Sequence, residues 1–190
     1  MRWAGFVLTG GRSSRMGEDK ALLLFDGAPL LKHQADVVRE AAGSVALIGD
    51  PARYSQLGYP AYPDRTPGCG PAGGIATALS LGAADWNLVV ACDMPRLNAP
   101  VLRLLLNKTD NSGAWSIVPI GPGGEPEPLG AVYHAACGPV LDRAIRGKRF
   151  KMRDLVRELK PLYVTGIDPA CFANANTPAE WAEIREPSST

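Results

Sequence analysis

Short, continuous apolar runs alternate along the chain with segments whose apolar positions recur every three or four residues. The continuous runs predict buried strands at residues 3–8, 44–48, 86–91, 114–119, 129–133 and 162–165. The helical spacing predicts helices at residues 29–42, 71–81, 137–146 and 152–159. Asn98 is expected to cap a further helix that carries the apolar residues Val101, Leu102, Leu105 and Leu106.

The end of the chain carries one more helix signal. Thr177 and Glu180 have the spacing of a capping box, and Pro178 stands at the first helical position. These residues predict a final helix, and residues 186–190 read as a frayed tail. We find no repeat, low-complexity tract or linker, so residues 1–190 are expected to form a single domain.

Alternating strands and helices predict the fold class. The order favours a three-layer α/β fold of Rossmann-like type, with a mainly parallel central sheet and helices on both faces. Ligands of such sheets bind beyond the carboxyl ends of the strands, where the strand order reverses. The loops that follow Leu8 and Ala91 are therefore the first places to look for chemistry.

The loop after the first strand has the composition of a phosphate site. Residues 8–20 read LTGGRSSRMGEDK, and the paired Gly10 and Gly11 allow several backbone N–H groups to face one anion. Arg15 offers a planar fork of donors to phosphate, and Lys20 offers a mobile positive charge. The loop is not a P-loop, because Glu18 rather than lysine follows Gly17, and it has no G-x-G-x-x-G dinucleotide pattern.

Two acids follow other predicted strands or turns. Asp93 comes directly after the buried run 86–91, at the carboxyl edge of the sheet. Because Mg²⁺ prefers oxygen ligands and often takes one carboxylate plus substrate phosphates, Asp93 is the first candidate for a magnesium ligand. The alternative is that it only turns the chain before Pro95. Asp64, in a turn-rich stretch, fits a turn residue and a ligand equally well.

Composition removes several other function classes. Twenty Lys and Arg residues against 19 Asp and Glu give a net charge of +1, which offers no broad field for nucleic acid. The four cysteines are scattered and there are only two histidines, His33 and His134, which does not suit a zinc site. We interpret both histidines as structural or surface residues rather than catalysts. Without a signal-peptide pattern or an apolar run of about 20 residues, we expect a cytoplasmic protein without a membrane partner.

The same segments resemble a known family. Leu8-Thr9-Gly10-Gly11, Ser13, Arg15-Met16-Gly17 and Asp19-Lys20 are similar to the pattern L-x-G-G-x-S-x-R-M-G-x-D-K of molybdenum cofactor guanylyltransferases, relatives of the sugar-nucleotide and cytidylyl transferases. The resemblance implies that this loop wraps a nucleotide triphosphate and that Lys20 binds phosphate. Thr9 departs from the usual alanine. Cys92-Asp93-Met94-Pro95 is similar to the family's metal-binding C-D-x-P segment.

Further segments extend the resemblance. Asp64, ahead of Gly70-Pro71-Ala72, is similar to the acid that precedes G-P-L-x-G and helps to hold the nucleotide, although Ala72 replaces leucine. The family often carries an asparagine after the second strand, where this chain has Gly49 and Asp50, so that contact is not expected here. The implied nucleotide site comprises Leu8, Thr9, Gly10, Gly11, Arg15, Lys20, Asp64 and Asp93, and the implied catalytic residues are Arg15, Lys20 and Asp93.

The second half of the chain is implied to bind the acceptor. Residues 127–133 resemble the family's substrate-side E-P-L-x-A-x-Y, and residues 174–178 match N-x-N-T-P. Asn174 and Asn176 are implied acceptor contacts, and Asn176 is also a candidate metal ligand. Cations gather at residues 143–153, where Lys148 and Arg149 are assigned to the acceptor, although such a run also fits a solvated helix face. Residues 1–96 would form the nucleotide half and residues 97–185 the acceptor half.

The implied activity is GMP transfer from GTP to the terminal phosphate of molybdopterin, or Mo-molybdopterin, with Mg²⁺ as cofactor. Molybdenum-insertion proteins and molybdoenzyme chaperones are the further implied partners. Gly10 and Gly11 favour guanylyl transfer by resemblance, because cytidylyl relatives usually show L-A-A-G. A cytidylyltransferase on molybdopterin, another NTP:phosphate nucleotidyltransferase, and a non-catalytic nucleotide-binding accessory protein remain open as alternatives.

Overall fold

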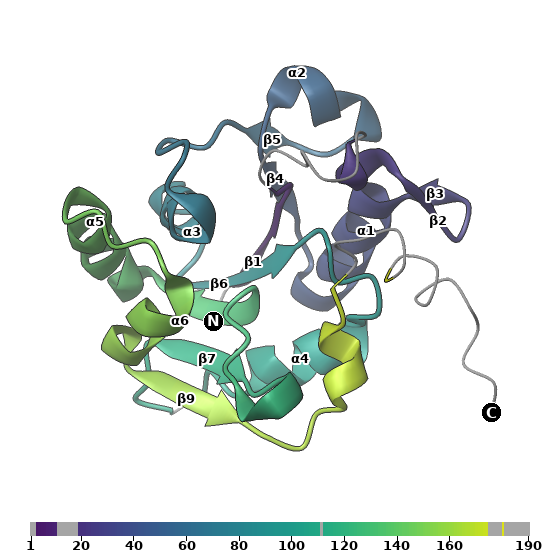
Figure 1. Ribbon diagram of the computed structural model, residues 1–190. Coiled ribbons are helices and arrows are strands. Elements are labelled where there is room, and N and C mark those ends of the chain that lie inside the picture. Colours follow the sequence, from purple (N-terminus) through teal and green to yellow (C-terminus); the bar gives the residue numbers. More distant parts are fainter. Residues whose placement is uncertain (1–2, 11–18, 111, 175–179, 181–190) are drawn as a thin grey trace.

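The computed structural model describes residues 3–10, 19–110, 112–174 and 180, and this part of the chain folds around a seven-stranded sheet (Figure 1). The strand order is β5-β4-β1-β6-β8-β7-β9, and only β8 runs antiparallel to its neighbours. The strands are β1 (Trp3–Leu8), β4 (Ala46–Ile48), β5 (Ala61–Tyr62), β6 (Trp86–Ala91), β7 (Ser116–Pro119), β8 (Gly130–His134) and β9 (Pro161–Val164). The prediction of a mainly parallel α/β sheet is confirmed.

Helices cover both faces of this sheet, which makes three layers (Figure 1). Successive side chains of a strand point to opposite faces, so Val7 packs in one core and Phe6 in the other. Helices α1 and α4 cover the face of Val7, whereas α3, α5 and α6 cover the face of Phe6. The helices are α1 (Leu30–Ala42), α2 (Pro51–Tyr54), α3 (Gly70–Ser80), α4 (Ala99–Asn107), α5 (Gly138–Arg146) and α6 (Met152–Leu155).

Local chemistry explains where the longer helices begin and end. The predicted stripe of α1 is buried, including the polar residue Gln34, and the helix stops at Gly43 in the left-handed conformation. The predicted cap of α4 is present, because the Asn98 side chain accepts a hydrogen bond of 3.1 Å from the Val101 backbone N–H. The last predicted helix, opened by Thr177, lies outside the described residues except for Glu180.

The structure differs from the sequence predictions in its short elements. Strands β2 (Leu24–Phe25) and β3 (Ala28–Pro29) form a separate hairpin that was not predicted, and neither were α2 and β5. The hairpin turns at Asp26 and Gly27, which both have positive φ. The segment predicted as one helix at 152–159 divides into α6 and the 3₁₀ helix Val156–Leu159.

The strand order positions the loops that carry chemistry. The chain moves outward from β1 to β4 and β5, then returns through α3 to place β6 on the other side of β1. Strands β1 and β6 are therefore parallel neighbours at the point where the strand order reverses, with Leu8 paired to Ala91 at their carboxyl ends. Their following loops lie side by side, joined by a hydrogen bond of 3.0 Å from Cys92 N–H to Leu8 O.

Candidate functional site

The first residues of the loop after β1 are fixed from both sides. The backbone N–H and the hydroxyl of Thr9 both donate to Ile48 O, at 3.1 and 3.2 Å, and the Cys92 thiol donates to Thr9 O at 3.3 Å. Gly10 follows with φ of +88°, a conformation that strains other residues. The entrance of the loop is thus held by β4 and by the loop after β6.

Thr9 fits its neighbour Gly49 closely. A Cβ atom added at Gly49 would lie 2.1 Å from the Thr9 hydroxyl oxygen. The Thr9 side chain therefore occupies the space that a side chain at position 49 would need. Threonine at position 9 is therefore compatible with glycine at position 49 but not with a residue that carries a side chain there.

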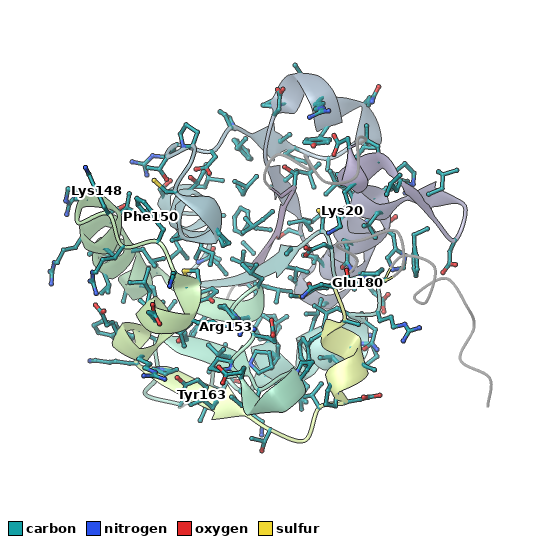
Figure 2. The ribbon with its side chains drawn as sticks, viewed as in Figure 1. Lys20, Lys148, Phe150, Arg153, Tyr163 and Glu180 are labelled. Atoms are coloured by element: carbon teal, nitrogen blue, oxygen red, sulfur yellow. The ribbon has the colours of Figure 1, made fainter. Side chains whose placement is uncertain are left out.

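Lys20 and Asp93 meet between these two loops. The Lys20 ammonium lies 3.3 Å from Asp93 Oδ2, and the Lys20 side chain is only 10% exposed (Figure 2). Lys20 opens the 3₁₀ helix Lys20–Leu22, whose first turn is capped by the Asp19 carboxylate accepting from Ala21 N–H. The predicted adjacency of the lysine turn and the acid after β6 is present.

Helix α2 holds the turn that carries Lys20. The Tyr54 hydroxyl donates to Asp19 Oδ2 at 2.9 Å, and Arg53 Nε forms an ion pair with the same oxygen at 3.1 Å. Burial, and then the hydrogen bond to Asp19, raise the pKa of Tyr54 to about 12, so its hydroxyl stays protonated and donates. A short helix that the sequence did not predict thus fixes a predicted site residue.

Helix α1 holds the segment that carries Asp93. The buried Gln34 side chain donates through Nε2 to Met94 O, and His33 Nε2 donates to Pro95 O at 3.2 Å. Both carbonyls belong to the two residues that follow Asp93. This accords with a structural role for His33, because its ring contacts the Pro95 carbonyl and the ring of Phe25.

A cavity of about 910 Å³ opens beyond the carboxyl ends of β1 and β6, and we name it the large cavity. Among the predicted nucleotide-site residues that line it, Thr9, Gly10 and Asp93 come from the two loops described above. Lys20 reaches this wall through its contact with Asp93. The remaining lining residues are Leu8, Ile48, Gly49, Asp64, Pro67, Gly68, Gly70, Pro71, Gly74, Ala91, Cys92 and Leu129.

Asp64 combines the two interpretations that the sequence left open. Its Oδ1 accepts hydrogen bonds of 2.9 Å from both the Thr66 backbone N–H and the Thr77 hydroxyl. The bond to the N–H two residues further on is typical of an aspartate that stabilises a turn. Asp64 also lines the large cavity. The hydrogen bonds from Thr66 and Thr77 therefore fix Asp64 at the wall of the large cavity, where it can contact a bound ligand.

A second cavity of about 590 Å³, the small cavity, adjoins the first. The two share Asp93 in their walls, which places this carboxylate on the boundary between them. Asn174, a predicted acceptor contact, lines the small cavity, and the charged residues Glu127, Lys151 and Arg153 also line it. Its other lining residues are Gly68, Cys69, Gly70, Pro71, Met94, Pro128, Leu129, Phe150 and Met152.

Glu127 is a buried acid to which the sequence analysis gave no role of its own. Its Oε1 accepts from Arg153 Nη2 at 3.3 Å, and burial raises its pKa even though Arg153 acts in the opposite direction. The backbone before Glu127 is tightly packed, since a Cβ atom at Gly121 would lie 2.4 Å from Glu127 Cγ. The buried Tyr133 hydroxyl donates to Pro128 O at 2.6 Å, which explains physically why this E-P motif is followed by a tyrosine.

The structure separates the cations of residues 143–153 into two groups. Lys151 and Arg153 line the small cavity, whereas Lys148 and Arg149, the two predicted acceptor contacts, are exposed and line neither cavity. Figure 2 shows Lys148 at the outer edge of the molecule and Arg153 nearer its centre. Arg149 instead forms a bidentate pair with Glu158, at 2.5 and 3.1 Å. The assignment of Lys148 and Arg149 to the acceptor therefore stays a prediction that these two cavities do not support, because charge spacing alone does not reveal which cations of the segment face a cavity.

Some expectations fall outside the described residues, namely those for Gly11, Arg15 and Asn176. Within the described part of the chain, no three His, Cys, Asp or Glu side chains gather as a metal site. The four cysteines are free thiols. None of the described helices has the length and apolar character needed to cross a membrane.

Comparison with known proteins identifies the family. Residues 5–162 match the profile of the MobA-like NTP transferase domain, which is most of the chain. The chain belongs to the MobA-like NTP transferase family. Within this family it is 34% identical over 183 residues to a probable molybdenum cofactor guanylyltransferase of Deinococcus radiodurans, covering 94% of this chain and 91% of that one.

Other similar proteins agree with this assignment. A probable molybdenum cofactor guanylyltransferase of Carboxydothermus hydrogenoformans is 30% identical over 185 residues, covering 94% of this chain and 92% of the relative. The crystal structure of molybdopterin-guanine dinucleotide biosynthesis protein A from Archaeoglobus fulgidus superposes with a TM-score of 0.81 at 23% identity, covering 96% of each chain. The latter similarity shows that the two proteins share a fold.

Proposed function

We propose that this chain transfers the GMP group of GTP to the terminal phosphate of molybdopterin, or of its molybdenum-loaded form, and releases pyrophosphate. Membership of the MobA-like family and the names of its relatives support this reaction. The observation that carries it is the position of Asp93, paired with Lys20, on the boundary between two cavities. A group transfer needs two substrates to meet at one point, and these cavities meet there.

The large cavity would take GTP. Its triphosphate would follow the loop from Leu8 to Lys20, with backbone N–H groups from Gly10 and Gly11 and side chains from Arg15 and Lys20 as phosphate ligands. The guanosine would then extend toward Asp64. Residues 1–96 would thus supply the nucleotide half of the protein, and residues 97–185 the acceptor half.

The residues at the boundary fit a hard divalent cation such as Mg²⁺. The Asp93 carboxylate is 25% exposed and offers oxygen ligands at the junction, and phosphate oxygens and Asn176 would complete the set. Bound there, Mg²⁺ would neutralise charge on the phosphates during transfer. Lys20 balances the charge of Asp93 and would turn toward the incoming phosphates.

The protein does not need to supply a proton-transfer group for this reaction. A phosphate oxygen of the acceptor would form a bond to the α-phosphorus of GTP as the bond to the bridging oxygen breaks, and pyrophosphate would leave with that electron pair. A phosphate monoester is largely ionised at pH 7, since its second pKa is about 6. No general base is needed, so catalysis reduces to positioning and charge neutralisation.

The test is the release of pyrophosphate by the purified protein with Mg²⁺, measured with and without molybdopterin and with GTP, CTP or UTP. We expect release only when GTP and molybdopterin are both present. Acceptor-dependent release with CTP instead of GTP would assign a cytidylyltransferase. No release with any nucleotide, despite nucleotide binding, would assign a non-catalytic accessory protein and overturn the proposal.

A further inference from the structure

The small cavity contains an arginine whose guanidinium is held at one edge by a buried carboxylate. We propose that this residue, Arg153, binds the phosphate of the acceptor, and that Glu127 positions it. The inference rests on the proposed function, because it assigns the small cavity to the acceptor. It goes further by naming which cation of residues 143–153 meets the acceptor phosphate and what holds that cation in place.

The positions of the charges lead to this assignment. An acceptor phosphate must come close to a triphosphate of the same sign, so it needs a cation supplied from the acceptor side. In the described part of the small cavity the cationic lining residues are Lys151 and Arg153. Both share the cavity wall with Asp93, which marks the boundary with the large cavity.

Arg153 suits a phosphate better than Lys151. A guanidinium has five N–H donors in a planar fork that matches phosphate oxygens, whereas an ammonium acts as a point charge. The contact with Glu127 uses Nη2 at 3.3 Å, and the Arg153 side chain is 57% exposed. The guanidinium can therefore keep one edge on Glu127 while its other donors face a ligand in the cavity.

Glu127 is built to hold Arg153 rather than to bind the ligand in its place. Its side chain is 10% exposed and is confined by Gly121, which leaves no room for a side chain beside Cγ. Its loop is further fixed by the bond from Tyr133 to Pro128 O. A fixed carboxylate limits the rotamers of a long, exposed arginine, which lowers the entropy lost when a ligand binds.

The principal experiment compares Arg153→Ala with Arg103→Ala in steady-state kinetics with GTP and molybdopterin. Arg103 is a matched control, since it also pairs with a glutamate, Glu40, but lines neither cavity. We expect Arg153→Ala to raise the KM for molybdopterin about 10- to 100-fold, as expected for a lost hydrogen bond to a charged group. The KM for GTP should stay within about twofold, and Arg103→Ala should match the wild type in both constants.

Two further variants test the positioning role. Arg153→Lys keeps the charge but loses the planar fork, so it should recover only part of the affinity for molybdopterin. Glu127→Gln keeps Arg153 but weakens its anchor, so we expect a rise of about threefold to tenfold in the KM for molybdopterin, with kcat little changed. Thermal unfolding of each variant shows whether a change in KM reflects loss of fold.

The outcomes separate this inference from the proposed function. If the wild type shows no acceptor-dependent turnover, the proposed function fails. If the wild type turns over and folded Arg153→Ala has a normal KM for molybdopterin, the proposed function stands and this inference is wrong. A rise in the KM for GTP instead would move Arg153 to the nucleotide side, which also overturns it.

Discussion

The two cavities that meet at Asp93 are lined in different ways. The large cavity is lined by five glycines and by backbone at the carboxyl ends of β1 and β6, with Asp64 and Asp93 as its charged residues in the described part of the chain. The small cavity is lined by charged side chains of both signs, including Glu127 and Arg153. Backbone donors suit a ligand common to many enzymes, such as a triphosphate, whereas side chains can be adapted to one acceptor.

Removing Asp93, the charged residue that lines both cavities, should impair the reaction more than any other substitution proposed for this protein. Asp93→Ala should reduce kcat/KM at least about 10³-fold, because it would remove the proposed metal ligand and the ion pair with Lys20. Pyrophosphate release measures the effect, and chelation of divalent cations should produce a similar loss in the wild type. Asp85→Ala is the matched control, since Asp85 is exposed and precedes β6 at the opposite end of the same strand. Near-normal activity of folded Asp93→Ala would refute the site.

Lys20→Ala should affect the reaction of GTP, in the large cavity, more than the binding of molybdopterin in the small cavity. We expect a loss of about 2–4 kcal/mol in transition-state stabilisation, as for removal of one preorganised donor, expressed mainly in kcat and in the constants for GTP. The KM for molybdopterin should change little. Lys32→Ala is a suitable control, because Lys32 pairs with Asp36 on the exposed face of α1. An equal loss of affinity for both substrates would contradict the division into two sides.

Tyr54→Phe should lower kcat less than Lys20→Ala does, because it only loosens the turn that carries Lys20. The variant would lose the hydrogen bond to Asp19, so the unfolding free energy should fall by about 1 kcal/mol and kcat should fall modestly. Tyr59→Phe is matched to it, since the Tyr59 hydroxyl also donates to an aspartate, but to Asp36 of α1 rather than to Asp19. Denaturant unfolding should show similar losses for both variants, whereas only Tyr54→Phe should lower kcat. If both variants lowered kcat, the fall in kcat would be explained by the loss of stability rather than by the position of Lys20.

A weaker effect is expected from pH, which should distinguish the Glu127–Arg153 pair from the Glu158–Arg149 pair. Burial raises the pKa of Glu127, whereas the hydrogen bond from Arg149 lowers the pKa of the exposed Glu158. Carboxyl NMR titration should find them on opposite sides of the ordinary value of about 4.3. Both carboxyls titrating together would show that burial does not distinguish the pairs.

These shifts have opposite consequences for stability. The contribution of Glu127 is present below the ordinary glutamate pKa and is lost as pH rises through its raised folded-state pKa. The stability of Glu127→Gln relative to the wild type should therefore increase over that rise in pH. The contribution of Glu158 is present above the ordinary value and is lost as pH falls through its lowered pKa.

The features that the sequence predicted depend on periodicity and on local motifs. Strands β1 and β6 are long, apolar and followed by polar loops, so both their burial and the adjacency of Lys20 and Asp93 followed from the rule for strand-order reversal. Helix α2 and strand β5 are too short to show a period. The pairing of Glu127 with Arg153 joins residues far apart in the sequence, and only the folding of the 147–153 segment determines which of its cations faces inward.

Because Thr9 and Gly49 fit closely together, a substitution at one position constrains which residues the other position can accept. A side chain introduced first at position 49 would push the Thr9 hydroxyl away from Ile48 O and disturb the loop entrance. Shortening residue 9 first would open the space that the later side chain needs. The order of replacement therefore matters to anyone who grafts a relative's loop onto this chain, and a pair of changes that is harmless together can be damaging in one of its intermediates.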